Sequence, residues 1–110
     1  MLYYLLDVYI RYTYTLIMIV SFGDKETELI YNQERSRKIP IEIQTRALVK
    51  LILLDSAGTE RDLQIPPSNR FERLKGNRNG FCSIRINDQW RIVFAFDNGR
   101  ASDVCIVDYH

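Results

Sequence analysis

The sequence predicts an α+β fold in which a curved, mostly antiparallel sheet carries two helices packed on one face. Two observations support this prediction. The first half of the chain holds one strand-like run and two helical stretches, whereas residues 71–110 alternate short β-like runs with polar turns. Such a separation of helices from strands along the chain is typical of α+β domains. With 110 residues, the chain is long enough for one domain with a single hydrophobic core.

Two helices are expected in the first half of the chain. Asp24 can cap a short helix that runs to about Tyr31, and Pro40 suits the first turn of a longer helix. Gly58 marks the expected end of the longer helix. Apolar residues recur along it at helical spacing and predict a stripe that packs in the core, formed by Ile43, Ala47, Leu51 and Leu54.

Residues 59–70 show no clear periodicity. Two adjacent prolines exclude a central strand or a helix in their neighbourhood. Leu63 and Ile65 are expected to pack beneath the sheet.

Residues 1–17 differ from the rest of the chain because they are rich in tyrosine and leucine. They are too short and too charged to span a membrane, and they lack the features of a signal peptide. Met18 follows at once and opens an ordinary strand-like run. We therefore expect the native protein to start at Met18 and its domain to cover residues 18–110. The alternative is that residues 1–17 form an accessory element that covers a sheet edge.

Two neighbouring strands are predicted over residues 81–86 and 90–96, which are rich in apolar, aromatic and β-branched side chains. A three-residue turn between them sets a register that gathers one apolar set on a single face. This register pairs Cys82 with Phe94, Ile84 with Ile92, and Ile86 with Trp90.

The opposite face of this hairpin carries Arg85 across from Arg91, and two like charges directly opposite each other repel. Two explanations are open: the guanidinium groups reach apart into water, or an anion sits between them. A further strand over residues 104–107 follows the Asp97-Asn98-Gly99 turn and returns antiparallel. The terminal Asp108-Tyr109-His110 is therefore expected to lie close to Arg91.

The net charge of the chain is +1, but basic residues gather in one stretch. Between Arg70 and Arg91, six basic residues stand against two acidic ones, Glu72 and Asp88. A local basic surface on a near-neutral protein indicates a polyanionic partner, with ordinary solvated charge as the common alternative. The basic residues of this stretch are Arg70, Arg73, Lys75, Arg78, Arg85 and Arg91.

Cys82 and Cys105 lie in strand-like runs among apolar neighbours. This placement predicts reduced, buried thiols in a cytosolic protein rather than a disulfide. Two cysteines and one histidine at this spacing match no pattern of metal ligands, and no phosphate-binding or dinucleotide-binding motif occurs. No metal and no cofactor are therefore expected.

The chain ends on an acceptor, a phenol and an imidazole placed side by side, in Asp108, Tyr109 and His110. Imidazole can transfer protons near neutral pH, and arginine or lysine can stabilise the extra charge on a phosphate in a transition state. Such a set would suit metal-free cleavage of RNA, in which the 2′-hydroxyl attacks its own phosphate. Taken singly, a lone terminal histidine is usually inert.

Three blocks of the chain together resemble the HigB-type toxins of the RelE/ParE toxin superfamily. The resemblance runs from about Met18 to the end and includes the terminal Tyr-His, so residues 1–17 lie outside it. The blocks are Asn69-Arg70 with Leu74-Lys75-Gly76-Asn77-Arg78, then Ser83-Ile84-Arg85-Ile86-Asn87-Asp88-Gln89-Trp90-Arg91-Ile92, then Val107-Asp108-Tyr109-His110.

The resemblance implies a RelE-like fold and the toxin of a bacterial type II toxin–antitoxin pair, which enters the ribosomal A site and cuts mRNA. Carried over by position, Lys75 and Arg91 would stabilise the scissile phosphate. Asp108, Tyr109 and His110 would form the terminal part of the catalytic centre. Candidates for contacts to the backbone of rRNA or mRNA are Arg70, Arg73, Arg78 and Arg85.

The resemblance also implies partners. A HigA-type antitoxin with a helix-turn-helix is expected, and promoter DNA would be bound only through that antitoxin. The ribosome and mRNA complete the set, so a cytoplasmic location without a membrane is expected.

One position departs from the family pattern. Some members carry a histidine three residues before the lysine of Leu-Lys-Gly, and here that position is Glu72. A glutamate could act as a base, could repel the phosphate, or could pair with Arg70 or Arg73. The Glu72 position keeps open a catalytically weak toxin that acts as co-repressor with its antitoxin. Two further alternatives are a ParE-like gyrase inhibitor, over which the Tyr-His terminus and Arg91 favour the nuclease, and a generic RNA-binding domain.

Overall fold

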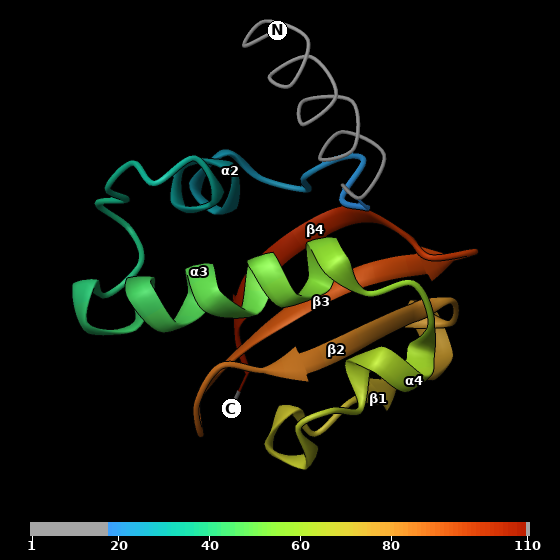
Figure 1. Ribbon diagram of the computed structural model, residues 1–110. Coiled ribbons are helices and arrows are strands. Elements are labelled where there is room, and N and C mark those ends of the chain that lie inside the picture. Colours follow the sequence, from blue (N-terminus) through green and yellow to red (C-terminus); the bar gives the residue numbers. More distant parts are fainter. Residues whose placement is uncertain (1–17, 110) are drawn as a thin grey trace, which may run out of the picture.

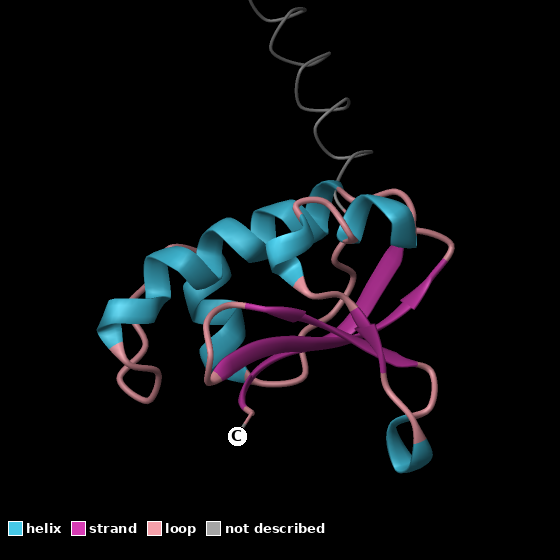
Figure 2. Cartoon of the chain, turned by 90° about the horizontal axis from the view of Figure 1, so that it is seen from below, coloured by secondary structure: helices cyan, strands magenta, loops and turns pink. Residues whose placement is uncertain are grey.

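The computed structural model describes residues 18–109, and it confirms the α+β prediction. Three α-helices, α2 (Lys25–Tyr31), α3 (Ile41–Ser56) and α4 (Glu60–Leu63), precede the sheet, with the short 3₁₀ turns η1 (Pro67–Asn69) and η2 (Gly76–Arg78) on either side of the first strand. The helices lie along one side of the sheet (Figures 1 and 2). The predictions made for residues 1–17 and for His110 lie outside the described residues.

The sheet has four strands in the order β1 (Glu72–Arg73), β2 (Phe81–Arg85), β3 (Trp90–Asp97) and β4 (Arg100–Asp108), and each neighbouring pair is antiparallel. We call the side of the sheet that faces away from the helices the open face. No helix within residues 18–109 is long and apolar enough to cross a membrane.

The hairpin of β2 and β3 has the predicted register. Cys82 lies opposite Phe94, Ile84 opposite Ile92 and Arg85 opposite Arg91. The turn is closed by the side-chain oxygen of Asn87, which accepts hydrogen bonds from the backbone N–H groups of Gln89 (2.9 Å) and Trp90 (2.7 Å). Alternation then sends one set of side chains to the core and the next set to the open face.

The hairpin of β3 and β4 turns through Asn98 and Gly99, whose φ angles of +51° and +78° fit the two-residue turn that matches the twist of paired strands. The register shifts between Val93 and Ala95, where Asp103 has a φ of +52°. This bulge adds one residue to β4. As a result Ala101, Val104 and Ile106 are all buried, although a regular strand would not place all three on one face.

Helix α3 lies across the sheet and supplies the largest part of the helical core (Figure 1). The predicted stripe of Ile43, Ala47, Leu51 and Leu54 is buried, as expected. The helix ends at Ser56 with Ala57 in an extended conformation, so the stop comes before Gly58. Another set of apolar residues on α3 is more than half exposed, namely Ile41, Val49 and Ile52.

Residues 59–70 are more regular than expected. Thr59 and Asp62 form a capping box, in which each side chain accepts a hydrogen bond from the other residue's backbone N–H, and this box starts α4. Leu63 is fully buried, as predicted. The prediction for Ile65 is wrong, because this side chain is 63% exposed in the turn that follows α4.

The opening run that starts at Met18 joins the edge of β4 through two parallel bridges, Ile19 to Ala101 and Phe22 to Val104. Asp55 of α3 anchors this run, because its Oδ1 accepts hydrogen bonds from the backbone N–H groups of Met18 and Ile19, both at 3.0 Å. Its Oδ2 accepts a hydrogen bond from the Tyr31 hydroxyl at 2.5 Å. Burial, followed by this bond and the charge of Asp55, raises the pKa of Tyr31 to about 12.

The raised pKa of Tyr31 predicts a loss of stability in alkali. The folded state holds the phenol proton more tightly than the unfolded chain, in which the pKa is about 10. The contribution should be complete below about pH 10 and be lost as the pH rises toward about 12. In Tyr31→Phe, the free energy of unfolding should fall less steeply with pH than in the wild type, as measured by urea denaturation between about pH 8 and about pH 11. Equal slopes for the two proteins would contradict the assignment.

Candidate active site

Arg91 of β3 is the centre of the site. It points to the open face of the sheet, yet it is only 8% exposed. Its Nε donates a hydrogen bond to Ser83 Oγ at 2.9 Å, and its Nη2 donates to the backbone oxygens of Arg70 at 2.5 Å and Ser83 at 3.4 Å. These bonds come from β2 and from the turn before β1, so the plane of the guanidinium is fixed from two sides.

The guanidinium groups of Arg85 and Arg91, which lie opposite each other, have separate partners within the protein. Arg85 pairs with Asp88, three residues further along the chain. Arg91 is held by the oxygens of Ser83 and Arg70. The explanation that both guanidinium groups reach apart into water is therefore wrong for Arg91.

The electrostatics of the site favour an anion. Burial lowers the pKa of Arg91, and the nearby charges of Arg85 and Arg70 act in the same direction, whereas Glu72 and Tyr109 oppose them. The guanidinium still remains protonated at neutral pH, because its ordinary pKa is very high. Its bonds go to neutral oxygens, which do not cancel its charge. A fixed, poorly hydrated cation of this kind suits a phosphate.

Tyr109 covers Arg91, as predicted. The guanidinium carbon of Arg91 lies 5.7 Å from the centre of the Tyr109 ring, which is within the range of a cation–π contact. The backbone N–H of Tyr109 donates a hydrogen bond to the Gln89 oxygen at 2.6 Å. The end of the chain is thereby tied to the turn between β2 and β3.

Asp108 takes a different position. It is the cross-strand partner of Trp90, so it alternates with Arg91 rather than lying opposite it. Its Oδ2 accepts a hydrogen bond from Gln89 Nε2 at 3.1 Å. His110, the last of the predicted terminal residues, lies outside the described part of the chain.

The arginines predicted to contact RNA fall into two groups. A hollow of about 240 Å³ is lined by Arg70, Arg85, Asn87, Asp88, Arg91 and Tyr109. A second hollow is lined by Arg78, Val107, Asp108 and Tyr109. The structure thus brings Arg70 and Arg85 into one cluster with Arg91 and Tyr109, whereas Arg78 lies in the neighbouring hollow, which shares only Tyr109 with the first.

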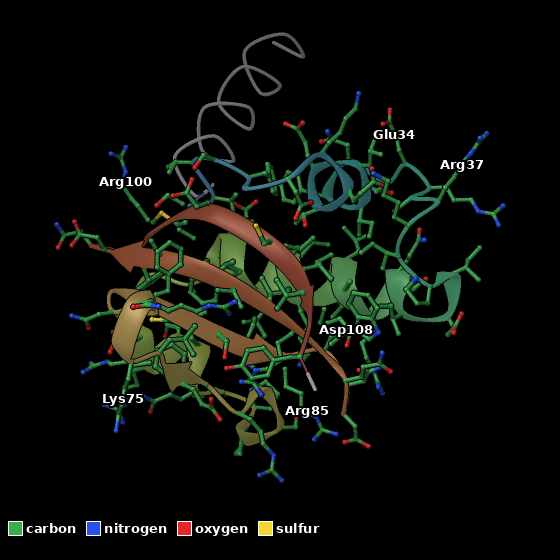
Figure 3. The ribbon with its side chains drawn as sticks, turned by 180° about the vertical axis from the view of Figure 1, so that it is seen from behind. Glu34, Arg37, Lys75, Arg85, Arg100 and Asp108 are labelled. Atoms are coloured by element: carbon green, nitrogen blue, oxygen red, sulfur yellow. The ribbon has the colours of Figure 1, made fainter. Side chains whose placement is uncertain are left out.

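Arg73 and Lys75 are not part of this cluster. Arg73 lies opposite the buried Cys82, and its guanidinium is paired with Glu60 of α4. Lys75 caps η2 beyond the start of β2, and Figure 3 shows it apart from Arg85 and Asp108. Glu72 lies on the open face opposite Ser83, so its charge acts on Arg91.

The sequence reasoning missed Ser83 and Gln89. Ser83 is fully buried and holds Arg91, whereas Gln89 holds the two terminal residues that the structure describes. A signal for Ser83 was present, because the predicted register already placed this small polar residue on the same face as Arg85 and Arg91. Both cysteines are free, Cys82 buried and Cys105 half-buried.

Comparison with known proteins now decides the family. Residues 20–110 match the model of the HigB-like toxins, described as RelE-like toxins of type II toxin–antitoxin systems. The chain belongs to this family. Toxin HigB-1 of Vibrio cholerae serotype O1 is 47% identical over 85 residues, which cover 76% of this chain and 90% of that protein. Endoribonuclease HigB of Proteus vulgaris is 34% identical over 95 residues, which cover 84% of this chain and all of that protein.

Solved structures agree on the fold. The chain is similar to a chain of the YoeB–YefM complex from Staphylococcus aureus, with a TM-score of 0.50 and 20% identity over 86% of this chain and 97% of that one. The YoeB dimer from the same organism gives a TM-score of 0.50 at 19% identity, over 86% of this chain and 98% of that one. As a HigB-like toxin of a type II system, the chain has an antitoxin as its partner.

The role of Ser83 in holding Arg91 can be tested by stability. Ser83→Ala leaves the buried Nε–H of Arg91 without its acceptor, which should lower the free energy of unfolding by about 1–3 kcal/mol. Ser102→Ala, on the same face of β4, should change it by less than about 0.5 kcal/mol. Urea denaturation of both variants measures the difference. Equal effects would mean that the Ser83 hydroxyl does not support Arg91.

Proposed function

We propose that this HigB-like toxin is a ribosome-dependent endoribonuclease. It enters the ribosomal A site in the cytoplasm and cuts mRNA there by attack of the 2′-hydroxyl on its own phosphate, without a metal. The observation that carries the proposal is the buried Arg91 cation, held by neutral oxygens and covered by Tyr109. The activity named for the relative from Proteus vulgaris supports it.

The chemistry needs three things from the protein: charge stabilisation on the phosphate, removal of the 2′-hydroxyl proton, and delivery of a proton to the leaving 5′-oxygen. Arg91 supplies the first, because a fixed guanidinium stabilises the extra charge of the transition state without reorganising. Lys75, which lies apart from the Arg91 cluster (Figure 3), would contact the phosphate of the bound mRNA as a second cation. Tyr109, His110 and Asp108 are the groups from which proton transfer is expected.

Glu72 gives the site an acidic group on the same face as Arg91. Its charge opposes the depression of the pKa of Arg91, so the two groups interact. A carboxylate here can take the 2′-hydroxyl proton, but it also repels the incoming phosphate. The second effect favours a second candidate function, in which a catalytically weak toxin acts mainly as co-repressor with its antitoxin.

Affinity for RNA would come from contacts between its phosphates and the arginines around the site, Arg70, Arg78 and Arg85. Arg73 and Lys75 would add contacts further from the site. Each phosphate that such a residue neutralises adds about 0.7 to the slope of log affinity against log salt for a single strand. The antitoxin is expected to be of the HigA type, and promoter DNA would be read by its helix-turn-helix rather than by this chain.

The test is in vitro translation of a defined mRNA, with new 5′ ends mapped by primer extension. The full-length protein should produce cuts within A-site codons in the presence of ribosomes and none on the same naked mRNA. If intact mRNA persists at several protein concentrations, the nuclease proposal fails. Gyrase inhibition and promoter binding with the antitoxin would then be measured.

Variants assign the roles in the same assay. Tyr109→Phe keeps the ring against Arg91 but removes the hydroxyl, and it should slow cleavage by about 10²–10⁴-fold if the phenol transfers a proton. Deletion of His110 should abolish cleavage. Arg100→Ala, which replaces an exposed residue at the start of β4, is the control and should cut like the wild type.

If Glu72→Ala cut as fast as the wild type, Glu72 would have no part in catalysis.

A further inference from the structure

Asn69 is a polar side chain with no exposed surface, and it lies just before the residue that holds Arg91. Its Nδ2 donates hydrogen bonds to the backbone oxygens of Leu63 and Ile65, both at 3.1 Å. Its Oδ1 accepts a hydrogen bond from Lys50 Nζ at 2.5 Å. One side chain therefore joins helix α3, the end of α4 and the turn that leads to β1.

The residue type fits this position closely. Only a side-chain amide offers an acceptor for the ammonium of Lys50 and, at the same time, two N–H groups for two carbonyls. An aspartate would keep the acceptor but would lose both donors. A serine has one donor and a shorter reach.

The next residue shows why the turn must be held. Arg70 has a φ of +45° and a ψ of +53°, in the left-handed region that non-glycine residues rarely adopt. Such a conformation persists only where the surroundings enforce it. The bonds of Asn69, together with the backbone bonds from Asn69 N to Pro66 O (2.9 Å) and from Arg70 N to Pro67 O (3.0 Å), supply that enforcement.

The left-handed conformation determines where the Arg70 carbonyl points, and that carbonyl accepts the 2.5 Å bond from Arg91 Nη2. We propose that Asn69, clamped by Lys50, is a positioning residue: it fixes the Arg70 carbonyl and thereby the orientation of the Arg91 guanidinium toward the scissile phosphate. Lys50 on α3 is thus connected to Arg91 on the open face. The connection runs through the hydrogen bond from Lys50 to Asn69, the backbone from Asn69 to Arg70, and the hydrogen bond from Arg91 to the Arg70 oxygen. The effect on cleavage rests on the proposed function, whereas the effect on Arg91 does not.

The test is the variant Asn69→Asp in the full-length protein. It keeps an acceptor for Lys50 and places a carboxylate against the carbonyls of Leu63 and Ile65. Asn32→Asp, at the exposed C-cap of α2, adds the same charge far from the turn and is the matched control.

The first readout is the ¹⁵N–¹H signal of the arginine Nε–H groups. Arg91 Nε–H, bonded to Ser83, should exchange with water at least tenfold faster in Asn69→Asp than in the wild type. The same Arg91 signal in Asn32→Asp serves as the reference and should not change. The second readout is ribosome-dependent cleavage, in which kcat should fall at least tenfold while KM stays within about twofold.

An unchanged Arg91 signal in a folded Asn69→Asp protein would overturn the proposal, whatever happens to cleavage. A lower melting temperature with normal Arg91 exchange and normal kcat would overturn it as well, since that is the result of a purely structural role. If Asn69→Asp does not fold, the variant Lys50→Met takes its place, because it removes the ammonium bonded to Asn69 but leaves both amide donors of Asn69. The exchange of Arg91 Nε–H with water should then be faster than in the wild type, by a smaller factor than expected for Asn69→Asp. An unchanged exchange rate would refute the proposal. If the wild type does not cleave mRNA, the proposed function fails, while the Arg91 signal still tests this inference.

Discussion

The fold and the site both depend on the burial of the Arg91 guanidinium. A charged group can be removed from water only where other groups replace the hydrogen bonds of the solvent. Ser83 on β2 and the Arg70 carbonyl before β1 provide that replacement. Both reach Arg91 only in the observed register, because a shift of one residue would turn Arg91 toward the core. The pairing that buries Ile84 and Ile92 is thus the pairing that builds the site.

The layered arrangement separates the two tasks of this small protein. Helices α2, α3 and α4 lie on one side of the sheet (Figure 2). The apolar side chains between these helices and the strands form the core. The other side is left for the arginines and Tyr109. Gln89 ties the end of β4 to the β2–β3 turn, so Tyr109 is held beside Arg91. In the proposed function, this basic side is the one that would meet the RNA.

Much of the architecture could be predicted from the sequence, because the signals were local or periodic. Alternation around Ile84 and Ile92 gave the register, and Asp24 caps α2 by accepting from the Thr27 N–H at 2.7 Å, as expected. The capping box of Thr59 and Asp62 was also readable, but α4 is only four residues long and two prolines follow it. The exposure of Ile65 could not be predicted from the sequence, because it depends on a turn that is held by tertiary hydrogen bonds.

Part of the candidate site was predictable, namely the approach of Tyr109 to Arg91, but its geometry was not. The arginine pair and the terminal Tyr-His could be located from spacing and resemblance. The acceptors of Arg91 could not, because one of them is a backbone carbonyl whose direction depends on the left-handed conformation of Arg70. The separation of Arg73 from the cluster was equally hidden, since its partner, Glu60, lies in a helix that was not expected.

In the proposed function, this cluster promotes attack by the 2′-hydroxyl on the adjacent phosphate. The most direct measurement replaces, in a translated mRNA, the nucleotides of one A-site codon by their 2′-deoxy forms and follows the cut at that codon. The account predicts that cleavage disappears wherever the 2′-hydroxyl next to the cut is missing and continues at unmodified codons of the same message. Cleavage that persists at the deoxy position would show that water or another nucleophile attacks, and it would contradict the mechanism built around Arg91 and Tyr109.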